Sequence, residues 1–186
     1  MVEPSPLSLP ELRDRTERGE SFAFLFFWGH RPLRDGSIGP GCLSQWWPAP
    51  FTVGGVTYAT AQHWMMAQKA RLFGDDVTAR HITAATHPGE AKALGRKVRG
   101  FDEQVWCEHR FDIVARGSVE KFGQHPELAD FLLGTRRRIL AEANPHDLVW
   151  GIGVTAKDER ATDPTRWPGL NLLGFALMHA REQLSP

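Results

Sequence analysis

Gln62 and Lys69 stand seven residues apart in the segment 58–70, and an amide and an amine can both act on a bound substrate. If the segment is a helix, this spacing is close to two turns and places both side chains on one face. Met66 and Phe73 belong to the same stripe, which in a globular helix normally carries buried apolar groups. An amine on such a stripe has a partner, has a function, or extends to water from the stripe's edge. The spacing alone favours the lysine that reaches water and leaves a chemical role open.

A second group of candidate residues lies in the stretch 140–153, which predicts a helix end followed by a polar, glycine-rich turn. Glu142 would stand at the helix end, where the helix dipole disfavours a carboxylate unless a cation such as Lys69 pairs with it. Trp150, directly before Gly151, is a candidate ring to stack on a flat ligand. Asp147 can act on a substrate or cap the turn, and the capping role is at least as well supported.

Phosphate groups are the ligands that the remaining polar positions suggest. Asn171 stands at the expected start of the last helix, where free backbone N–H groups suit a phosphate and an ordinary N-cap is equally compatible. Basic side chains that could contact nucleic-acid phosphates form a run at 136–138 and a helix face with Lys92, Arg96 and Arg99. Such charges are more often the solvated side of a helix.

The elements that would position these residues are mostly helical. The sequence predicts a strand over 22–28, a loop over 29–42 and a hairpin over 51–58 around Gly54 and Gly55. Thr60 can cap the helix that contains Gln62. Other helices are predicted over 7–18, 88–98, 102–122, 126–142 and 170–183. The expected fold is α+β, a helix-dominated single domain over 1–186 with a short hairpin or small sheet and a core at about 22–184.

Composition narrows the class of protein. The chain has 186 residues, a net charge of zero and a pI near 7.1, so no global positive field draws it to nucleic acid and any such contact must be local. Its two cysteines form no disulfide framework and no zinc-ligand spacing, which favours a reducing cytoplasm and no metal. The longest apolar run, at 22–28, is far too short to span a membrane.

Four separated blocks of this sequence resemble the NADAR (YbiA-like) family of N-glycosidases. They are Gly-Cys-Leu-Ser-Gln-Trp at 41–46, the helix at 58–70, Asp-Leu-Val-Trp-Gly-Ile-Gly at 147–153 and Leu-Asn-Leu-Leu-Gly-Phe-Ala-Leu-Met at 170–178. The blocks occur in the family's order, and four together are far more specific than one short pattern. The resemblance covers residues 22–184.

The resemblance implies hydrolysis of a bond between ribose C1′ and a nitrogen, without a cofactor. The family's helix motif reads Thr-x-Glu-His-Tyr-x-x-x-x-Lys, and this chain matches it at Thr60, His63 and Lys69 but has Gln62 in place of the catalytic glutamate. Glutamine keeps the shape of glutamate and loses its charge. Either the protein works differently, or Gln62 is a deliberate change that inactivates the enzyme, and we favour the second explanation. Lys69 would attack C1′ or, when charged, hold a carboxylate or phosphate; we weakly favour the nucleophile.

Further site roles are implied by the same resemblance. Asp147, Trp150 and Glu142 join Gln62 and Lys69 as candidate catalytic residues. The candidate ligand-binding residues are Ser44, Gln45, Trp46, His63, Arg96, Gly151 and Asn171. We expect the two sets to converge around an anomeric carbon.

The family's branches differ in substrate. One removes ADP-ribose from guanine in DNA or RNA, and the other cleaves ribosylamino-pyrimidine phosphates of the riboflavin pathway. Ile152 replaces an aspartate that one family variant carries after Trp-Gly, which weakens the riboflavin alternative. We therefore expect ADP-ribosylated guanine in nucleic acid as substrate and an ADP-ribose-type ligand. A third alternative is a module that binds ADP-ribose or NAD without cleaving it.

Overall fold

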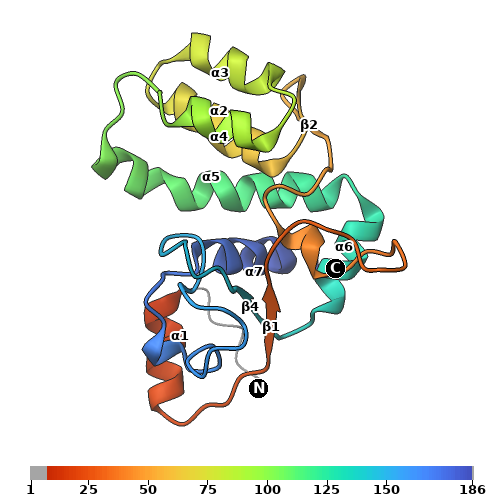
Figure 1. The fold of residues 1–186 in the computed structure, drawn as a ribbon, viewed down its shortest axis with the longest axis vertical. Helices are drawn as coiled ribbons and strands as arrows, with labels where there is room; N and C mark the ends of the chain where they lie inside the picture. Colours follow the sequence, from red (N-terminus) through yellow and green to blue (C-terminus); the bar gives the residue numbers. More distant parts are fainter. Residues whose placement is uncertain (1–7, 186) are drawn as a thin grey trace. The chain divides into compact units, whose positions relative to one another are not determined.

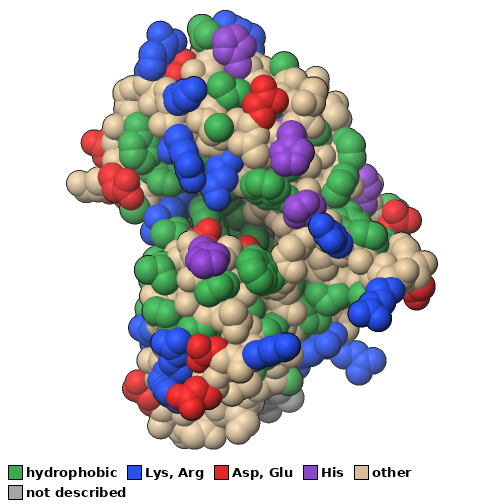
Figure 2. Space-filling model, viewed as in Figure 1, with side chains coloured by type: hydrophobic (Ala, Val, Ile, Leu, Met, Phe, Trp, Pro, Cys, Tyr) green, Lys and Arg blue, Asp and Glu red, His purple; other side chains and the backbone are tan. Residues whose placement is uncertain are grey.

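The computed structural model describes residues 8–185 and confirms an α+β fold. Leu7, at the start of the first predicted helix, lies outside the described residues. The chain divides into two compact units, Met1–Ser44 with Glu127–Pro186 as the first and Gln45–Pro126 as the second. Each unit is described by itself below. On the face in view, positive and negative side chains are interspersed (Figure 2), as the zero net charge leads one to expect.

The first unit is built on two parallel strands, β1 (Phe24–Phe27) and β4 (Ile139–Glu142), which lie side by side in Figure 1. The helix α7 (Leu172–Leu184) packs against β4, and its residues 173–178 are all buried. The unit also contains α1 (Leu9–Glu17), η1 (Pro40–Leu43), η2 (Pro164–Arg166) and most of α6 (Pro126–Gly134). Leu140 and Ala141 are fully buried, so the core of this unit lies around β4.

The second unit is a helical layer that follows a hairpin. The strands β2 (Phe51–Val53) and β3 (Val56–Tyr58) pair antiparallel about Gly54 and Gly55, whose φ angles of 57° and 78° suit the tight turn. They lead into four helices, which run alongside one another in Figure 1: α2 (Ala61–Leu72), α3 (Asp76–Ala84), α4 (Pro88–Gly95) and α5 (Glu103–Gly123). The helix α2 contacts the other three, and therefore forms the centre of this unit.

The predicted helix over 126–142 is wrong in its second half. The helix α6 ends at Gly134, Arg136 has a left-handed φ of 53°, and the chain then enters β4. Residues with adequate helix propensity form a strand here because Ile139 pairs with Phe24, more than a hundred positions earlier in the chain. Glu142 therefore stands at a strand end, and the argument from a helix dipole does not apply to it.

The remaining predictions differ mainly in their bounds. The hairpin, the Thr60 cap and the helix that begins after Asp102 are confirmed. The helix α3 was not predicted, although Asp75 provides a good N-cap by accepting the Thr78 N–H. Among residues 8–185, no helix combines the length and the apolar character that crossing a bilayer requires.

Candidate functional site

The helix α2 begins at a cap that also fixes the segment before it. The Thr60 hydroxyl accepts the His63 N–H, and the Gln62 N–H donates to the Gln45 carbonyl at 2.9 Å. Residues 61–67 are all buried, so the first two turns of α2 are enclosed on every side. A polar side chain in these turns must find its partners inside the protein or on a ligand.

Gln62 is such a side chain, and only half of its amide has a partner. The side chain is 4% exposed, and its Oε1 accepts a hydrogen bond from the Trp46 indole Nε1–H at 3.2 Å. Its Nε2 is buried and has no hydrogen-bond partner among the described residues. Because the indole N–H can only donate, it fixes the orientation of the amide and leaves the NH₂ group as the unused donor. An unpaired buried donor is unfavourable, and a ligand oxygen would satisfy it.

The indole of Trp46 connects Gln62 to a histidine that sequence analysis missed. The Trp46 and His87 rings lie edge to face, with their centroids 5.6 Å apart. His87 is exposed and its Nδ1 accepts the Gly89 N–H at 3.0 Å, which caps α4. Nδ1 is therefore the acceptor nitrogen and Nε2 carries the proton when the ring is neutral. The sequence signal was a histidine directly before Pro88 at a helix start, where Ser, Thr, Asp or Asn is usual.

Lys69 is half-buried, and Glu103 acts on it only through space. Its Nζ donates to the Gly95 carbonyl at 3.1 Å and lies over the Phe101 ring, 4.0 Å from the centroid, with the Trp106 ring at 5.5 Å. Burial lowers the pKa of Lys69, and Glu103 acts in the opposite direction. The two ring faces also favour the charged amine. This environment suits an ammonium held in place better than a free amine nucleophile.

His63 has a structural environment. It is completely buried, its Nδ1 lies 2.8 Å from the Thr60 hydroxyl, and its Nε2 lies 3.1 Å from the Ala85 carbonyl. A carbonyl can only accept, so Nε2 carries the proton and Nδ1 accepts from the hydroxyl. Both ring nitrogens are thus engaged within the second unit, which favours a positioning role for His63 over direct contact with a ligand.

The turn that contains Trp150 is held by the side chain of Asp147. Its Oδ1 accepts the Val149 and Trp150 N–H groups at 2.9 and 2.8 Å, which is the capping geometry. A Cβ on Gly151 would stand 2.8 Å from the Glu142 carbonyl oxygen and 3.1 Å from that of Asp147, so only glycine fits. Trp150 itself is half-buried. The Trp-Gly pair thus has a packing reason that is independent of any ligand.

The Asn171 side chain does not cap α7 and is not placed to bind a phosphate there. It is fully buried with a left-handed φ of 54°, and its side chain accepts the Glu142 N–H at 3.0 Å and donates to the Leu140 carbonyl at 2.9 Å. The amide therefore pairs with β4 as a neighbouring strand would. The expected phosphate at the start of α7 is a wrong prediction, because the Leu172 and Leu173 N–H groups already donate to carbonyls of the Trp150 turn.

The structure groups the predicted residues by unit. Gln45, Trp46, Gln62, His63, Lys69 and Arg96 belong to the second unit. The first contains Ser44, Glu142, Asp147, Trp150, Gly151 and Asn171. Gln45, Trp46 and Gln62 are brought into contact, and so are Glu142 and Asn171. Arg96 is exposed at the end of α4, and Ser44 ends η1. Within residues 8–185, no group of three or more His, Cys, Asp or Glu side chains is placed to hold a metal ion.

Comparisons with known proteins identify similar chains. Residues 26–185 match the NADAR domain. The chain is 39% identical over 169 residues to N-glycosidase R617 of Acanthamoeba polyphaga mimivirus, a match that covers 88% of this chain and 98% of that protein. It is 35% identical over 136 residues to the chloroplastic riboflavin biosynthesis protein PYRR of Zea mays, covering 69% of this chain and 20% of that one. The NMR structure of the E. coli protein YbiA is similar with a TM-score of 0.67 and 27% identity, covering 89% of this chain and 86% of that chain.

Proposed function

The chain belongs to the NADAR family, and we propose that it is an N-glycosidase that hydrolyses the ribose C1′–N bond of ADP-ribosylated guanine in nucleic acid. The observation that carries the proposal is the unused amide donor of Gln62, which is buried beside the Trp46 indole on the helix that bears the family motif. A ribose hydroxyl oxygen would satisfy this donor. The proposed ligand would thereby complete the hydrogen bonding of α2.

The chemistry assigns different tasks to the residues around this donor. Cleavage of the C1′–N bond develops positive charge on the ribose ring, which an anion or a directed dipole near C1′ stabilises. The Gln62 amide can orient the ribose but cannot offset a full charge. A glutamate at this position would keep one oxygen on the Trp46 indole and direct the other to where the unused nitrogen now stands. Position 62 therefore decides how fast the bond breaks, while Trp46 fixes the geometry.

Lys69 is proposed to act as a cation and not as a nucleophile. The carbonyl of Gly95 and the Phe101 ring hold its ammonium, and detaching the amine to attack C1′ would break both contacts. This revises the nucleophile that we favoured weakly from the sequence. Borohydride reduction of the protein with substrate should leave no covalent adduct on Lys69, and recovery of an adduct by peptide mass spectrometry would restore the nucleophile.

Release of ADP-ribose, measured by liquid chromatography, tests the proposed activity, because hydrolysis of the C1′–N bond frees ADP-ribose and leaves the guanine in the strand. We expect Gln62→Glu to release ADP-ribose from ADP-ribosylated DNA at least about ten-fold faster than the unchanged chain, because an anion then faces the developing charge. Gln68→Glu is the matched control, since Gln68 lies on the same helix and bonds only the Tyr58 hydroxyl. If neither variant releases product while circular dichroism shows native helix, the assignment of position 62 is wrong.

Two alternatives are separated by the same assay. The amide at position 62 favours a module that binds ADP-ribose without cleaving it, and such a module would melt at a higher temperature with ADP-ribose yet release no ADP-ribose from modified DNA even as Gln62→Glu. The Zea mays relative favours a riboflavin-pathway substrate. Faster release from ribosylamino-pyrimidine phosphates than from ADP-ribosylated DNA would assign that substrate.

A further inference from the structure

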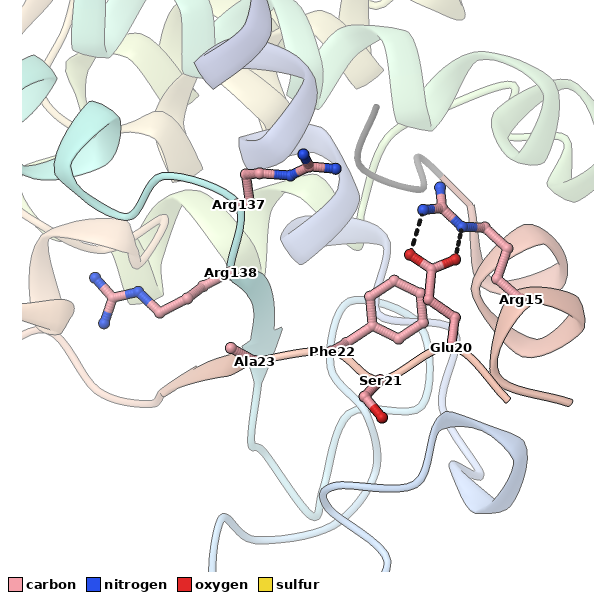
Figure 3. A pocket seen from close by; sticks show the side chains of 7 residues that line it. All are labelled: Arg15, Glu20, Ser21, Phe22, Ala23, Arg137 and Arg138. Carbon is pink, nitrogen blue, oxygen red and sulfur yellow. Dashed lines mark hydrogen bonds and ion pairs between the residues drawn. The ribbon is translucent and has the colours of Figure 1, made fainter. Parts of the chain in front are cut away.

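A hollow on the first unit is lined by arginines and an aromatic ring. The cavity has a volume of about 290 Å³, and among its lining residues are Arg15, Glu20, Phe22, Arg137 and Arg138. Figure 3 shows Arg15 and Glu20 joined by two contacts on one side and Arg137 and Arg138 on the segment that enters β4. Among the described residues of this lining, Glu20 is the acid and Arg15, Arg137 and Arg138 are the cations.

The acid in this hollow is already engaged. Glu20 accepts from Arg15 Nε and Nη2 at 2.7 and 2.6 Å, and the hydrogen bond to Arg15 is the main reason why the pKa of Glu20 is lowered. The Arg15 guanidinium also lies over the Phe22 ring, 5.4 Å from its centroid. Arg137 also acts on Glu20 through space, and Arg137 and Arg138 carry the further positive charges of the described lining.

The turn that presents these two arginines is anchored by a buried cation. Arg181 is 4% exposed and donates through Nη1 to the Thr135 hydroxyl at 2.8 Å and to the Arg138 carbonyl at 2.9 Å. Within residues 8–185 it forms no ion pair, and its Nη2 is buried without a partner. Burial lowers the pKa of Arg181 to about 10. The guanidinium remains charged at neutral pH and adds positive charge beneath the turn, and Glu182 acts on it only through space.

Backbone strain at the same turn also favours a bound anion. Arg136 has a φ of 53°, which is unfavourable for a residue with a long side chain. A strained turn above a buried, unpaired arginine destabilises the free protein, and a bound anion would offset part of that cost. Next to it, Phe22, Phe24 and Phe26 alternate along β1 and its approach, each half-exposed, and Trp28 is 60% exposed.

We propose that this surface binds the phosphodiester backbone of a single-stranded nucleic acid through Arg137 and Arg138. Arginines beside partly exposed aromatic rings are the combination that holds single strands, since the cations contact phosphates and the rings stack with bases. The chain has zero net charge, so this local patch would supply the attraction that the whole molecule lacks. The inference builds on the proposed function, because it adds contacts to the strand that carries the modified guanine.

Fluorescence anisotropy with an unmodified oligothymidylate of about 12 nucleotides tests the strand site without any catalysis. Compared with the unchanged chain, Arg137→Gln/Arg138→Gln should bind at least about ten-fold more weakly, and the slope of log K against log salt should become less negative by about 1.4, or 0.7 for each lost phosphate contact. The control Arg34→Gln/Lys157→Gln removes the same charge from exposed positions of the same unit and should change affinity less than about two-fold. Equal losses in both double variants, or no binding by the unchanged chain, would overturn the proposal.

Further measurements identify the ligand and separate this inference from the proposed function. Inorganic phosphate and a matched duplex serve as competitors, and displacement by phosphate as effective as by the single strand would overturn the proposal in favour of a small-anion site. Arg137→Glu alone keeps the Arg138 contacts with the turn, and should also weaken binding at least about ten-fold while circular dichroism remains native. Release of ADP-ribose from free ADP-ribosylated guanosine should be equal in the two double variants. A chain that binds the strand but releases no ADP-ribose fails the proposed function and retains this inference.

Discussion

Lys69 matches the family's helix motif, but its environment does not fit the nucleophile role first expected of it. The match of Lys69 to the family motif suggested a nucleophile, whereas the structure places its ammonium against two aromatic rings and a carbonyl. The contact with the Phe101 ring should stabilise the protein by about 0.5 to 2 kcal/mol.

Replacing this amine tests the cation–π contact. We expect Lys69→Met to keep the apolar stem and to lower the free energy of unfolding by about 1 kcal/mol in urea titrations. Lys92→Met on the exposed face of α4 is the matched control and should leave the midpoint almost unchanged. If the two variants unfold at the same urea concentration, the rings do not stabilise the ammonium.

Protonation of His63 gives the second prediction for a single residue. The pKa of His63 is lowered, chiefly by burial, from its ordinary value of 6.5, so the unfolded chain binds the proton more readily than the folded one. The stability that the neutral ring contributes is fully present above about pH 6.5 and is lost as the pH falls from there towards the lower folded-state pKa.

Melting temperatures between about pH 7.5 and 5.5 measure this effect. The unchanged chain should lose stability over this interval, because a protonated Nδ1 can no longer accept from the Thr60 hydroxyl. His63→Gln has no such titration and should show a flatter profile from a lower starting temperature. Parallel profiles would assign the acid sensitivity to other groups.

At the scale of elements, the amide of Asn171 joins α7 to the edge of β4. We expect Asn171→Gly to keep the left-handed backbone and to leave the Glu142 N–H and the Leu140 carbonyl unpaired, which destabilises the protein by about 1 to 3 kcal/mol for each buried group. Asn171→Ala should be worse by about 1 kcal/mol, because alanine disfavours a positive φ. Guanidinium unfolding measures both, and a smaller loss for alanine than for glycine would contradict the role of the backbone.

Elements with local signals could be predicted from the sequence, and those fixed by distant contacts could not. The capping side chains of Thr60 and Asp102 indicate helix starts, and the pair Gly54 and Gly55 indicates a hairpin. The strand β4 depends on Phe24 to Phe27, so nothing near Ile139 indicates it. The residues of the candidate site divide in the same way. Spacing in the sequence identified Gln62 and Lys69. The Trp46–Gln62 contact, the place of His87 beside Trp46 and the hydrogen bonds of Asn171 to β4 depend on packing between distant segments.

At the scale of the whole molecule, the two units differ in how far apart their partners lie in the chain. The second unit is one continuous segment, Gln45–Pro126, whose helices contact near neighbours. The first needs β1 to meet β4 across about 115 residues. In refolding followed by pulsed hydrogen exchange, we expect the amides of α2 and α5 to be protected before those of β1 and β4. Simultaneous protection in every element would show that chain separation does not order the folding.

The long separation between β1 and β4 also matters while the chain is being made. Phe24–Phe27 leaves the ribosome long before Ile139–Glu142 exists, so an aromatic segment with unsatisfied backbone groups must wait through most of translation. A chaperone that binds unfolded chains would protect the segment during this interval. Nascent chains released before residue 139 should be prone to aggregate through this segment.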